Sequence, residues 1–246
     1  MYALKLFLLC VIFVILILFS LYFNFYENFT LKNTSYEDYR LGDFIKGWIF
    51  NNQKHKQKNI LEKFPNSLCA KYYNIVKNMP DHKKWNNIEV IDKLLNDINT
   101  ETPENDTLVI NLRLGDAITG YSNGKFTYRG NNYVSTGIYG ICIEKLKKFL
   151  LSNKSKFKKV TLVYGIHQGA SYDLSFSEKY LELLRKFLEE NNIKYSERHN
   201  ENPDLDFAFM CKSKNFMPSG SGFSRLIMDV VKFRKNKIFT VNNKDL

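Results

Sequence analysis

Cysteine is scarce in this chain, and its spacing excludes the commonest structural uses of that residue. The sequence of 246 residues has four cysteines, and Cys10 lies inside a long apolar run. The intervals between Cys69, Cys142 and Cys211 match no zinc-binding pattern. One disulfide could form among these three, with one thiol left over. For Cys211 we prefer burial as a small apolar side chain.

Long polar segments that would stay disordered are also lacking, and so is any nucleic-acid-binding motif. The formal net charge of +11 could by itself indicate nucleic acid or an acidic membrane surface as a partner. The lysines, however, are spread along amphipathic stretches such as 145–159. We interpret them as a solvated helix face, and we expect no nucleic-acid partner.

Charged residues are absent from Leu6–Phe23, where Leu, Ile, Val and Phe dominate. A run of about 18 apolar residues is close to the lower limit for crossing a hydrocarbon core of ~30 Å. A cleaved signal peptide is the alternative, but bulky side chains stand where a small-residue cleavage site would be. We therefore predict that residues 1–27 form a short cytosolic tail and an uncleaved transmembrane anchor.

Glycosylation triplets of the form Asn-x-Ser/Thr follow this run at Asn28, Asn33, Asn105 and Asn153. Each one alone is weak evidence, because such triplets arise by chance in sequences rich in Asn and Lys. Together they favour a lumenal body. We expect a single-pass membrane protein of the ER or Golgi.

Two regions of different pattern follow the anchor. Apolar residues recur at helical spacing between Tyr36 and about Asn99, so residues 28–104 are expected to form a small helical region. From Thr107 onward, strands alternate with helices. The predicted strands are Thr107–Leu112, Lys159–Tyr164, Ile193–Ser196, Phe216–Pro218 and Lys237–Val241. The predicted helices are Ile138–Leu151, Phe176–Glu190, a short helix that the carboxylate of Asp204 would cap, and Phe223–Arg234.

This alternation predicts an α/β fold in which residues 105–246 form a Rossmann-like domain with a mostly parallel sheet. In such sheets, ligands bind beyond the carboxyl ends of the strands. Polar residues gather at these ends in the sequence, which supports a site at this edge. The stretches that follow the first four predicted strands are Arg113–Asp116, Gly165–His167, Glu197–His199 and Ser219–Ser221.

The loop Ser219–Gly222 lies between a predicted strand and a predicted helix. Its glycines let the backbone approach a ligand closely, and the first N–H groups and the dipole of the following helix favour negative charge. This pattern is typical of a phosphate site. An ordinary turn between a strand and a helix is the alternative.

Three motifs in this order resemble those of the fucosyltransferase superfamily, which includes α-1,2-, α-1,6- and protein O-fucosyltransferases. They are N-L-R-L-G-D at Asn111–Asp116, D-x-D-F-x-x-M at Asp204–Met210, and S-x-F-S at Ser221–Ser224. The likeness covers about 108–238. It implies a GT-B-like fold and an inverting glycosyltransferase that transfers fucose from GDP-fucose to a hydroxyl of a glycan or protein. The implied enzyme uses the nucleotide sugar as its donor substrate and requires neither a cofactor nor a metal ion.

The resemblance also implies roles for individual residues. Arg113 would bind the β-phosphate of GDP-fucose and stabilise the departing diphosphate, because a guanidinium can bind it bidentately. The structural alternative for Arg113 is a salt bridge to Asp116, whose implied role is mainly to hold the loop. Asp206 would accept hydrogen bonds from the guanine N–H groups. The implied residues on the phosphate side are Ser221, Gly222, Phe223 and Ser224.

Two departures from the family pattern leave the donor sugar open. Asn111 stands where the family usually has His, and Leu114 stands where several branches have a second Arg. A glycosyltransferase that uses another nucleotide sugar, or a non-catalytic lectin-like or scaffold relative, is therefore the alternative. Acceptor specificity would lie in the short region of residues 28–104, which does not reveal the acceptor.

The general base and the metal question also stay open in the sequence. His167, Glu197, His199 and Asp116 are candidates to take the proton of the acceptor hydroxyl. Asp204-Leu205-Asp206 could also be the paired carboxylates that hold Mn²⁺ in GT-A glycosyltransferases. The apolar spacing after Asp206 is helical, whereas those carboxylates usually end a strand, so we assign no metal ligand.

Overall fold

The computed structural model describes residues 61–80, 87–128, 131–132, 141–165, 173–199, 202–220 and 222–241. The chain forms two compact units, residues 1–37 and 38–246, and every described residue belongs to the second. The anchor predicted at Leu6–Phe23 lies outside the described residues. Within the described ranges, no helix combines the length and the apolar character needed to cross a bilayer.

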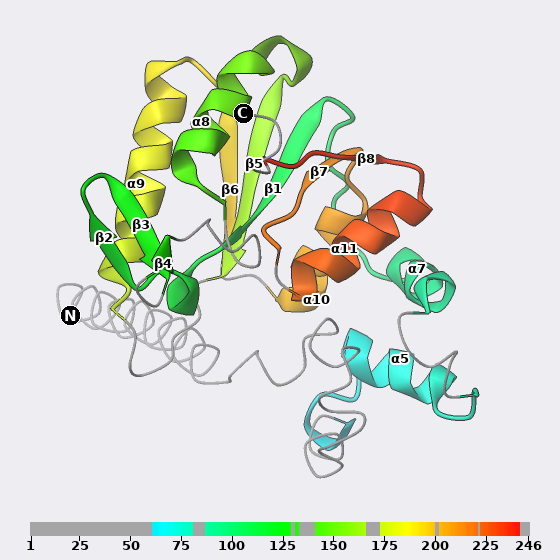
Figure 1. Cartoon of the computed structure of the whole chain (residues 1–246). Coiled ribbons are helices and arrows are strands. Elements are labelled where there is room, and N and C mark those ends of the chain that lie inside the picture. Colours follow the sequence, from blue (N-terminus) through cyan, green and yellow to red (C-terminus); the bar gives the residue numbers. More distant parts are fainter. Residues whose placement is uncertain are drawn as a thin grey trace, which may run out of the picture. The chain divides into compact units, whose positions relative to one another are not determined.

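Five parallel strands form the central sheet in the spatial order β6-β5-β1-β7-β8 (Figure 1). Counted along the chain within this sheet, the strand order is third, second, first, fourth, fifth, which matches the first five strands of the Rossmann fold. The topological switch point therefore lies between β1 and β7. The strands are β1 (Thr107–Arg113), β5 (Lys159–Gly165), β6 (Tyr195–His199), β7 (Asn215–Met217) and β8 (Lys237–Ile238).

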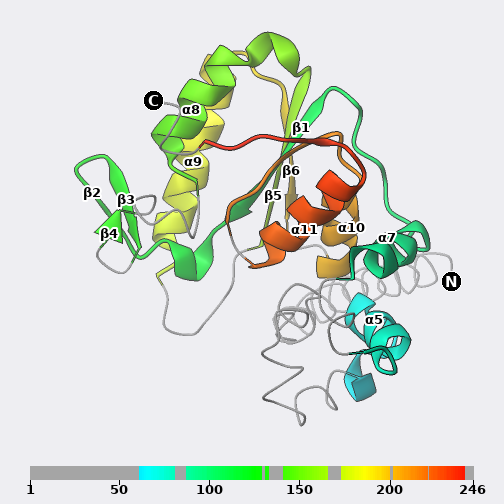
Figure 2. The ribbon, with the colours of Figure 1, turned by 45° about the vertical axis from the view of Figure 1, so that its right-hand side comes forward.

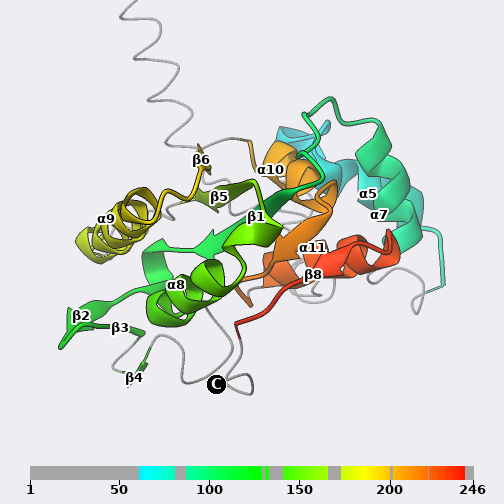
Figure 3. The same cartoon turned by 90° about the horizontal axis from the view of Figure 1, so that it is seen from above.

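Helices cover both faces of this sheet, so the predicted α/β architecture with a parallel sheet is confirmed (Figures 1 and 3). One face carries α8 (Ile143–Ser152) and α9 (Ser175–Glu190). The other face carries α10 (Pro203–Cys211) and α11 (Gly222–Phe233). A 3-10 turn, Lys154–Lys156, lies between α8 and β5.

The central strand β1 is apolar because both of its faces are covered. Leu108, Ile110 and Leu112 belong to the core beneath α8 and α9. Successive side chains of a strand point to opposite faces. Asn111 and Arg113 therefore share the other face, toward α10 and α11.

In the described part of the chain, α5 (Leu68–Val76) and α7 (Ile88–Asn96) precede the sheet, as the apolar spacing predicts (Figure 2). Each begins with a side-chain cap, since Ser67 Oγ accepts from the Ala70 amide at 3.2 Å and Asn87 Oδ1 accepts from the Val90 amide at 3.2 Å. The boundaries at 28 and 104 stay predictions.

A small antiparallel sheet between β1 and α8 was not predicted. It consists of β2 (Gly120–Ser122), β3 (Lys125–Tyr128) and β4 (Asn131–Asn132), in that order. Its first turn has Asn123 at φ 49° and Gly124 at φ 77°. A two-residue hairpin turn prefers Asn-Gly, because both of its central residues have positive φ. The Asn-Gly dipeptide was therefore the sequence signal that could have revealed this hairpin.

Candidate functional site

Arg113 ends strand β1, and the loop that begins at Ser219 follows the neighbouring strand β7. Arg113 is the last residue of β1 and is half-buried. Strand β7 ends at Met217, and α11 begins at Gly222. Because β1 and β7 are hydrogen-bonded neighbours, the loop adjoins the end of β1 at the topological switch point.

A chain of buried hydrogen bonds joins β1 to this loop. Ser219 Oγ donates to Asn111 Oδ1 at 3.0 Å, and Asn111 Nδ2 donates to the Val163 carbonyl at 3.4 Å. The Ser219 amide donates to Ser224 Oγ at 2.9 Å. Ser219 and Ser224 are 1 % and 0 % exposed. These bonds hold the loop between β1 and the first turn of α11.

The start of α11 has no acidic side chain that would repel an anion. Gly220 has φ +84°, a left-handed conformation that glycine adopts at little cost. The first turn of α11 contains no acidic residue, whereas α10 begins with Asp204 and Asp206. The N–H groups that begin a helix carry partial positive charge. Of these two helix starts, that of α11 therefore suits an anion.

The predicted phosphate-side residues have different environments. Ser221 lies outside the described residues. Gly222 is the first residue of α11, and the Phe223 ring packs against Phe207 of α10 with ring centroids 5.5 Å apart. Ser224 is buried and accepts the hydrogen bond from Ser219, so in this structure its hydroxyl shapes the loop. Their contact with a phosphate stays a prediction.

The N-L-R-L-G-D motif continues past Arg113 into a turn. Leu114 is 1 % exposed in the core beneath α8 and α9, so a second Arg at this position would not face the site. Asp116 lies in the 3-10 turn Gly115–Ala117, and its side chain is outside the description. The Gly115 amide donates to Ser177 Oγ at 2.9 Å, which attaches the turn to α9. The sequence did not indicate this role for Ser177.

Asp206, the predicted guanine-reading residue, takes part in a buried ion pair. Arg198 Nε donates to Asp206 Oδ1 at 2.6 Å, and the two side chains are 13 % and 11 % exposed. Arg198 also lies over the Phe209 ring, 4.9 Å from its centroid, and donates from Nη1 to Glu101 at 3.2 Å. One oxygen of Asp206 thus serves to hold β6 to α10, and recognition of a base by this residue stays a prediction.

The pair Asp204 and Asp206 does not converge on one point. Asp204 Oδ2 accepts from the Leu68 amide at 2.7 Å, at the start of α5. Burial raises the pKa of Asp204 to about 6, against the smaller opposing effects of the Leu68 amide and Lys71. The side chains of residues two positions apart on a helix point to different sides. Within the described ranges, no group of three or more His, Cys, Asp or Glu side chains could hold a metal ion.

Asp204 was also expected to begin its own helix as a cap, and this detail was wrong. The cap of α10 is Asn202, whose Oδ1 accepts from the Asp204 amide at 2.9 Å. Pro203 follows at the first helical position, where its missing N–H costs nothing. The carboxylate of Asp204 is therefore available to cap α5 instead.

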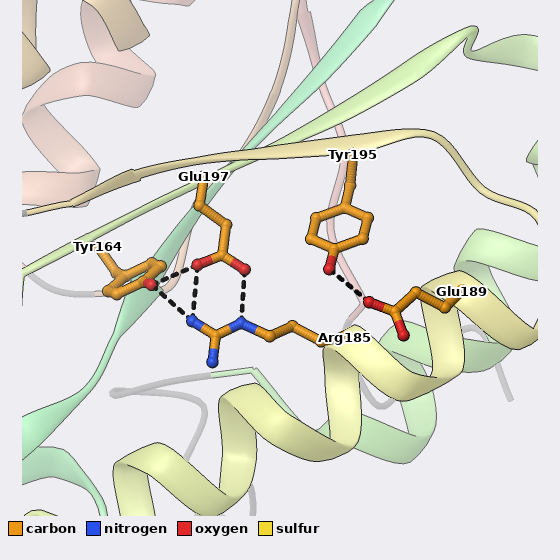
Figure 4. Close-up of polar contacts among 5 residues, drawn as sticks. All are labelled: Tyr164, Arg185, Glu189, Tyr195 and Glu197. Atoms are coloured by element: carbon orange, nitrogen blue, oxygen red, sulfur yellow. Dashed lines mark hydrogen bonds and ion pairs between the residues drawn. The ribbon is translucent and has the colours of Figure 1, made fainter.

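Glu197 is held in a hydrogen-bonded cluster with Arg185 and Tyr164 (Figure 4). The strand register places it on the face of the sheet toward α8 and α9, opposite to the face of Arg113. Arg185 of α9 donates from Nε to Oε1 at 2.6 Å and from Nη2 to Oε2 at 2.7 Å. The Tyr164 hydroxyl also donates to Oε2, at 2.6 Å. The Arg185 hydrogen bonds hold the pKa of Glu197 below its usual value. A carboxylate bound in this way is a poor general base.

The other base candidates are not brought to Arg113 by any described contact. His199 is exposed at the end of β6, and its ring stacks on Tyr164 with centroids 5.3 Å apart and planes 8° apart. His167 lies outside the described residues. Glu197–His199 was expected to follow the third strand of the sheet, but it forms the end of that strand. The general base stays unassigned.

Comparison with known proteins adds little. No family model matches the chain, and none of the curated proteins matches it. Among solved structures, the crystal structure of POFUT1 in complex with GDP-fucose is similar at a TM-score of 0.32 and 16 % sequence identity. The match covers 76 % of this chain and 58 % of that chain, so it spans less than two thirds of POFUT1. A likeness of this degree establishes neither a family nor an activity for this chain.

Proposed function

We propose that this chain is a membrane-anchored inverting glycosyltransferase that transfers fucose from GDP-fucose to a hydroxyl of a glycan or protein. The observation that carries the proposal is the hydrogen bond from Ser219, in the loop after β7, to Asn111, two residues before Arg113, at the switch point of the sheet. The order of the three sequence motifs supports the choice of donor. The anchor predicted in residues 1–27 supports a lumenal location in the ER or Golgi.

The proposed reaction breaks the bond between the anomeric carbon of the sugar and a phosphate oxygen. The acceptor oxygen attacks from the opposite face, which inverts the configuration, and its proton passes to a base. The nucleoside diphosphate leaves with additional negative charge. Arg113 would stabilise that charge bidentately, together with the N–H groups that begin α11. Asp206 would bind the base of the nucleotide, and the helices α5 and α7 would lie on the acceptor side.

Calorimetric titration of the full-length chain in detergent tests the donor site. We expect micromolar binding of GDP that is stronger than binding of UDP and unaffected by EDTA or Mn²⁺. Arg113→Ala should abolish this binding while circular dichroism shows an unchanged fold. Lys186→Ala removes the same charge from an exposed position on α9 and is the matched control.

Three outcomes lead to different conclusions. Preference for UDP would replace GDP-fucose by another nucleotide sugar, and loss of binding in EDTA would indicate a metal-dependent enzyme. Absence of any nucleotide binding in a folded sample would overturn the proposal. The non-catalytic lectin-like or scaffold alternative would then be favoured.

A further inference from the structure

We infer that Asn111 is a positioning residue for the diphosphate site, acting through the hydroxyl of Ser219. The inference rests on the proposed function and adds a role to a residue that departs from the family motif. Asn111 touches no proposed ligand group itself. It fixes where the loop after β7 stands relative to Arg113.

The first step is the position of Asn111 within the sheet. It lies on β1 two residues before Arg113, and by strand alternation both side chains are on the face toward α10 and α11. Its Cα pairs with that of Val163 on β5, and it is 7 % exposed. A polar side chain this deeply buried is costly unless its hydrogen bonds are made.

The second step is that the nitrogen and the oxygen of the Asn111 amide group make hydrogen bonds to different partners. The Val163 carbonyl can only accept a hydrogen bond, so the amide nitrogen of Asn111 faces it. The amide oxygen therefore faces Ser219 and accepts from its hydroxyl. One side chain thus connects the loop to β1 and to β5 at once, which limits the movement of Ser219 along the strand direction.

The third step concerns the backbone of the loop. The Ser219 amide is already used in its bond to Ser224 Oγ, so it is not directed at a ligand. Among the described residues, the next N–H groups that can be offered to a diphosphate are those of the left-handed Gly220 and of Gly222, the first residue of α11. Since Ser219 is held at both its hydroxyl and its amide, the direction of these groups depends on the Asn111–Ser219 bond.

The test is a double-mutant cycle on the full-length chain, with GDP as the titrant. Ser219→Ala and Asn111→Ala should each weaken GDP binding roughly three- to tenfold, the effect of about one hydrogen bond. The double variant should bind GDP about as well as the weaker of the two single variants, because both remove the same contact. Ser219→Thr, which retains a hydroxyl, should restore most of the affinity.

Ser196→Ala is the matched control. It removes the hydroxyl contact with Thr161 at 3.1 Å, on the same face of the same sheet but without contact to the loop. Its GDP affinity should equal that of the wild type. Additive effects of the two single variants, or an equal loss of affinity in Ser196→Ala, would overturn the inference.

Hydrogen exchange separates this inference from the proposed function. Without ligand, the amides of residues 219–224 should exchange faster in Ser219→Ala than in the wild type. Unchanged exchange there would overturn the role of Asn111, even if GDP binds. If the wild type binds no GDP, the proposed function fails, and with it the ligand assigned to the loop.

Discussion

Arg185 holds both carboxylate oxygens of Glu197, with Nε 2.6 Å from Oε1 and Nη2 2.7 Å from Oε2 (Figure 4). The two residues lie on α9 and β6, so the pair fixes a helix to the edge of the sheet. Its geometry is the bidentate arrangement that makes arginine–carboxylate pairs specific. Glu197, a candidate catalytic base in the sequence, therefore has a structural role: its ion pair with Arg185 joins β6 to α9.

We predict that Glu197→Gln lowers stability and leaves turnover nearly unchanged. Loss of the charged bonds should cost about 1–2 kcal/mol, since the pair is partly exposed. For a chain of this size that is a fall in Tm of roughly 2–8 °C, measurable by circular dichroism. Glu189→Gln, at an exposed contact with Tyr195, should shift Tm much less. A kcat reduced by a hundredfold or more in a folded Glu197→Gln variant would instead make Glu197 the base.

Asp204→Asn should change the pH dependence of stability. The folded-state pKa of Asp204 is raised to about 6 from a usual value of 3.8, so the folded protein binds this proton more tightly than the unfolded chain does. Its contribution is therefore fully present below pH ~4 and is lost as pH rises through about 6. Asn keeps the acceptor for the Leu68 amide and carries no charge.

Urea unfolding at pH 4, 5.5 and 7 tests this prediction. The variant should gain stability relative to the wild type as pH rises, by about 1–3 kcal/mol at pH 7, and the two proteins should converge near pH 4. Asp106→Asn provides a control of opposite sign, because a hydrogen bond with Lys158 lowers the pKa of the half-buried Asp106. Parallel pH profiles for Asp204→Asn and the wild type would contradict the assignment.

Arg225→Glu should have opposite effects on stability and on ligand affinity. Arg225 is exposed near the start of α11, where a cation opposes the helix dipole. A carboxylate there should stabilise the fold by about 0.3–1 kcal/mol. The same change should weaken GDP binding by tenfold or more, because it places negative charge beside the proposed diphosphate. Equal GDP affinity in Arg225→Glu and the wild type would place the anion elsewhere.

Gly165 offers a test of the space beside Arg113. The two residues pair across β5 and β1, Gly165 is exposed, and an added Cβ would meet nothing within 4 Å. Gly165→Ala should therefore leave both Tm and GDP affinity nearly unchanged. Gly165→Glu should weaken GDP binding by tenfold or more, because its carboxylate competes for the Arg113 guanidinium. If titration shows the same affinity for both variants, Arg113 does not bind the diphosphate.

The order of strands and helices could be predicted because its signals are local. Apolar runs such as Thr107–Leu112 and the periodicity of Phe176–Glu190 correspond closely to β1 and α9. The end of β6 was misjudged because β6 is an edge strand, and its residues are half-buried or exposed. Polar residues such as Glu197 are compatible with such a strand and do not mark its end.

The partners of the site residues could not be predicted, since they are set by packing between distant segments. Ser219 and Asn111 are 108 positions apart in the sequence, and nothing in either local pattern indicates their bond. Arg198 and Asp206 are close in sequence, but their pairing depends on how α10 lies across β6. The edge of the sheet that carries the candidate site could be predicted from the fold class alone, whereas the contacts of each polar side chain required the structure.

The placement of β1 in the middle of the sheet also affects how the chain can be assembled during synthesis. Its neighbour β5 pairs Lys159 with Thr107, a separation of 52 residues, whereas its other neighbour, β7, pairs Asn215 with Leu108, a separation of 107 residues. While the ribosome is still adding these residues, one side of β1 lacks its partner strand. Unpaired strand edges attract other chains. A nascent chain halted before β7 is therefore expected to require a chaperone, and truncation there should yield aggregation rather than a smaller folded protein.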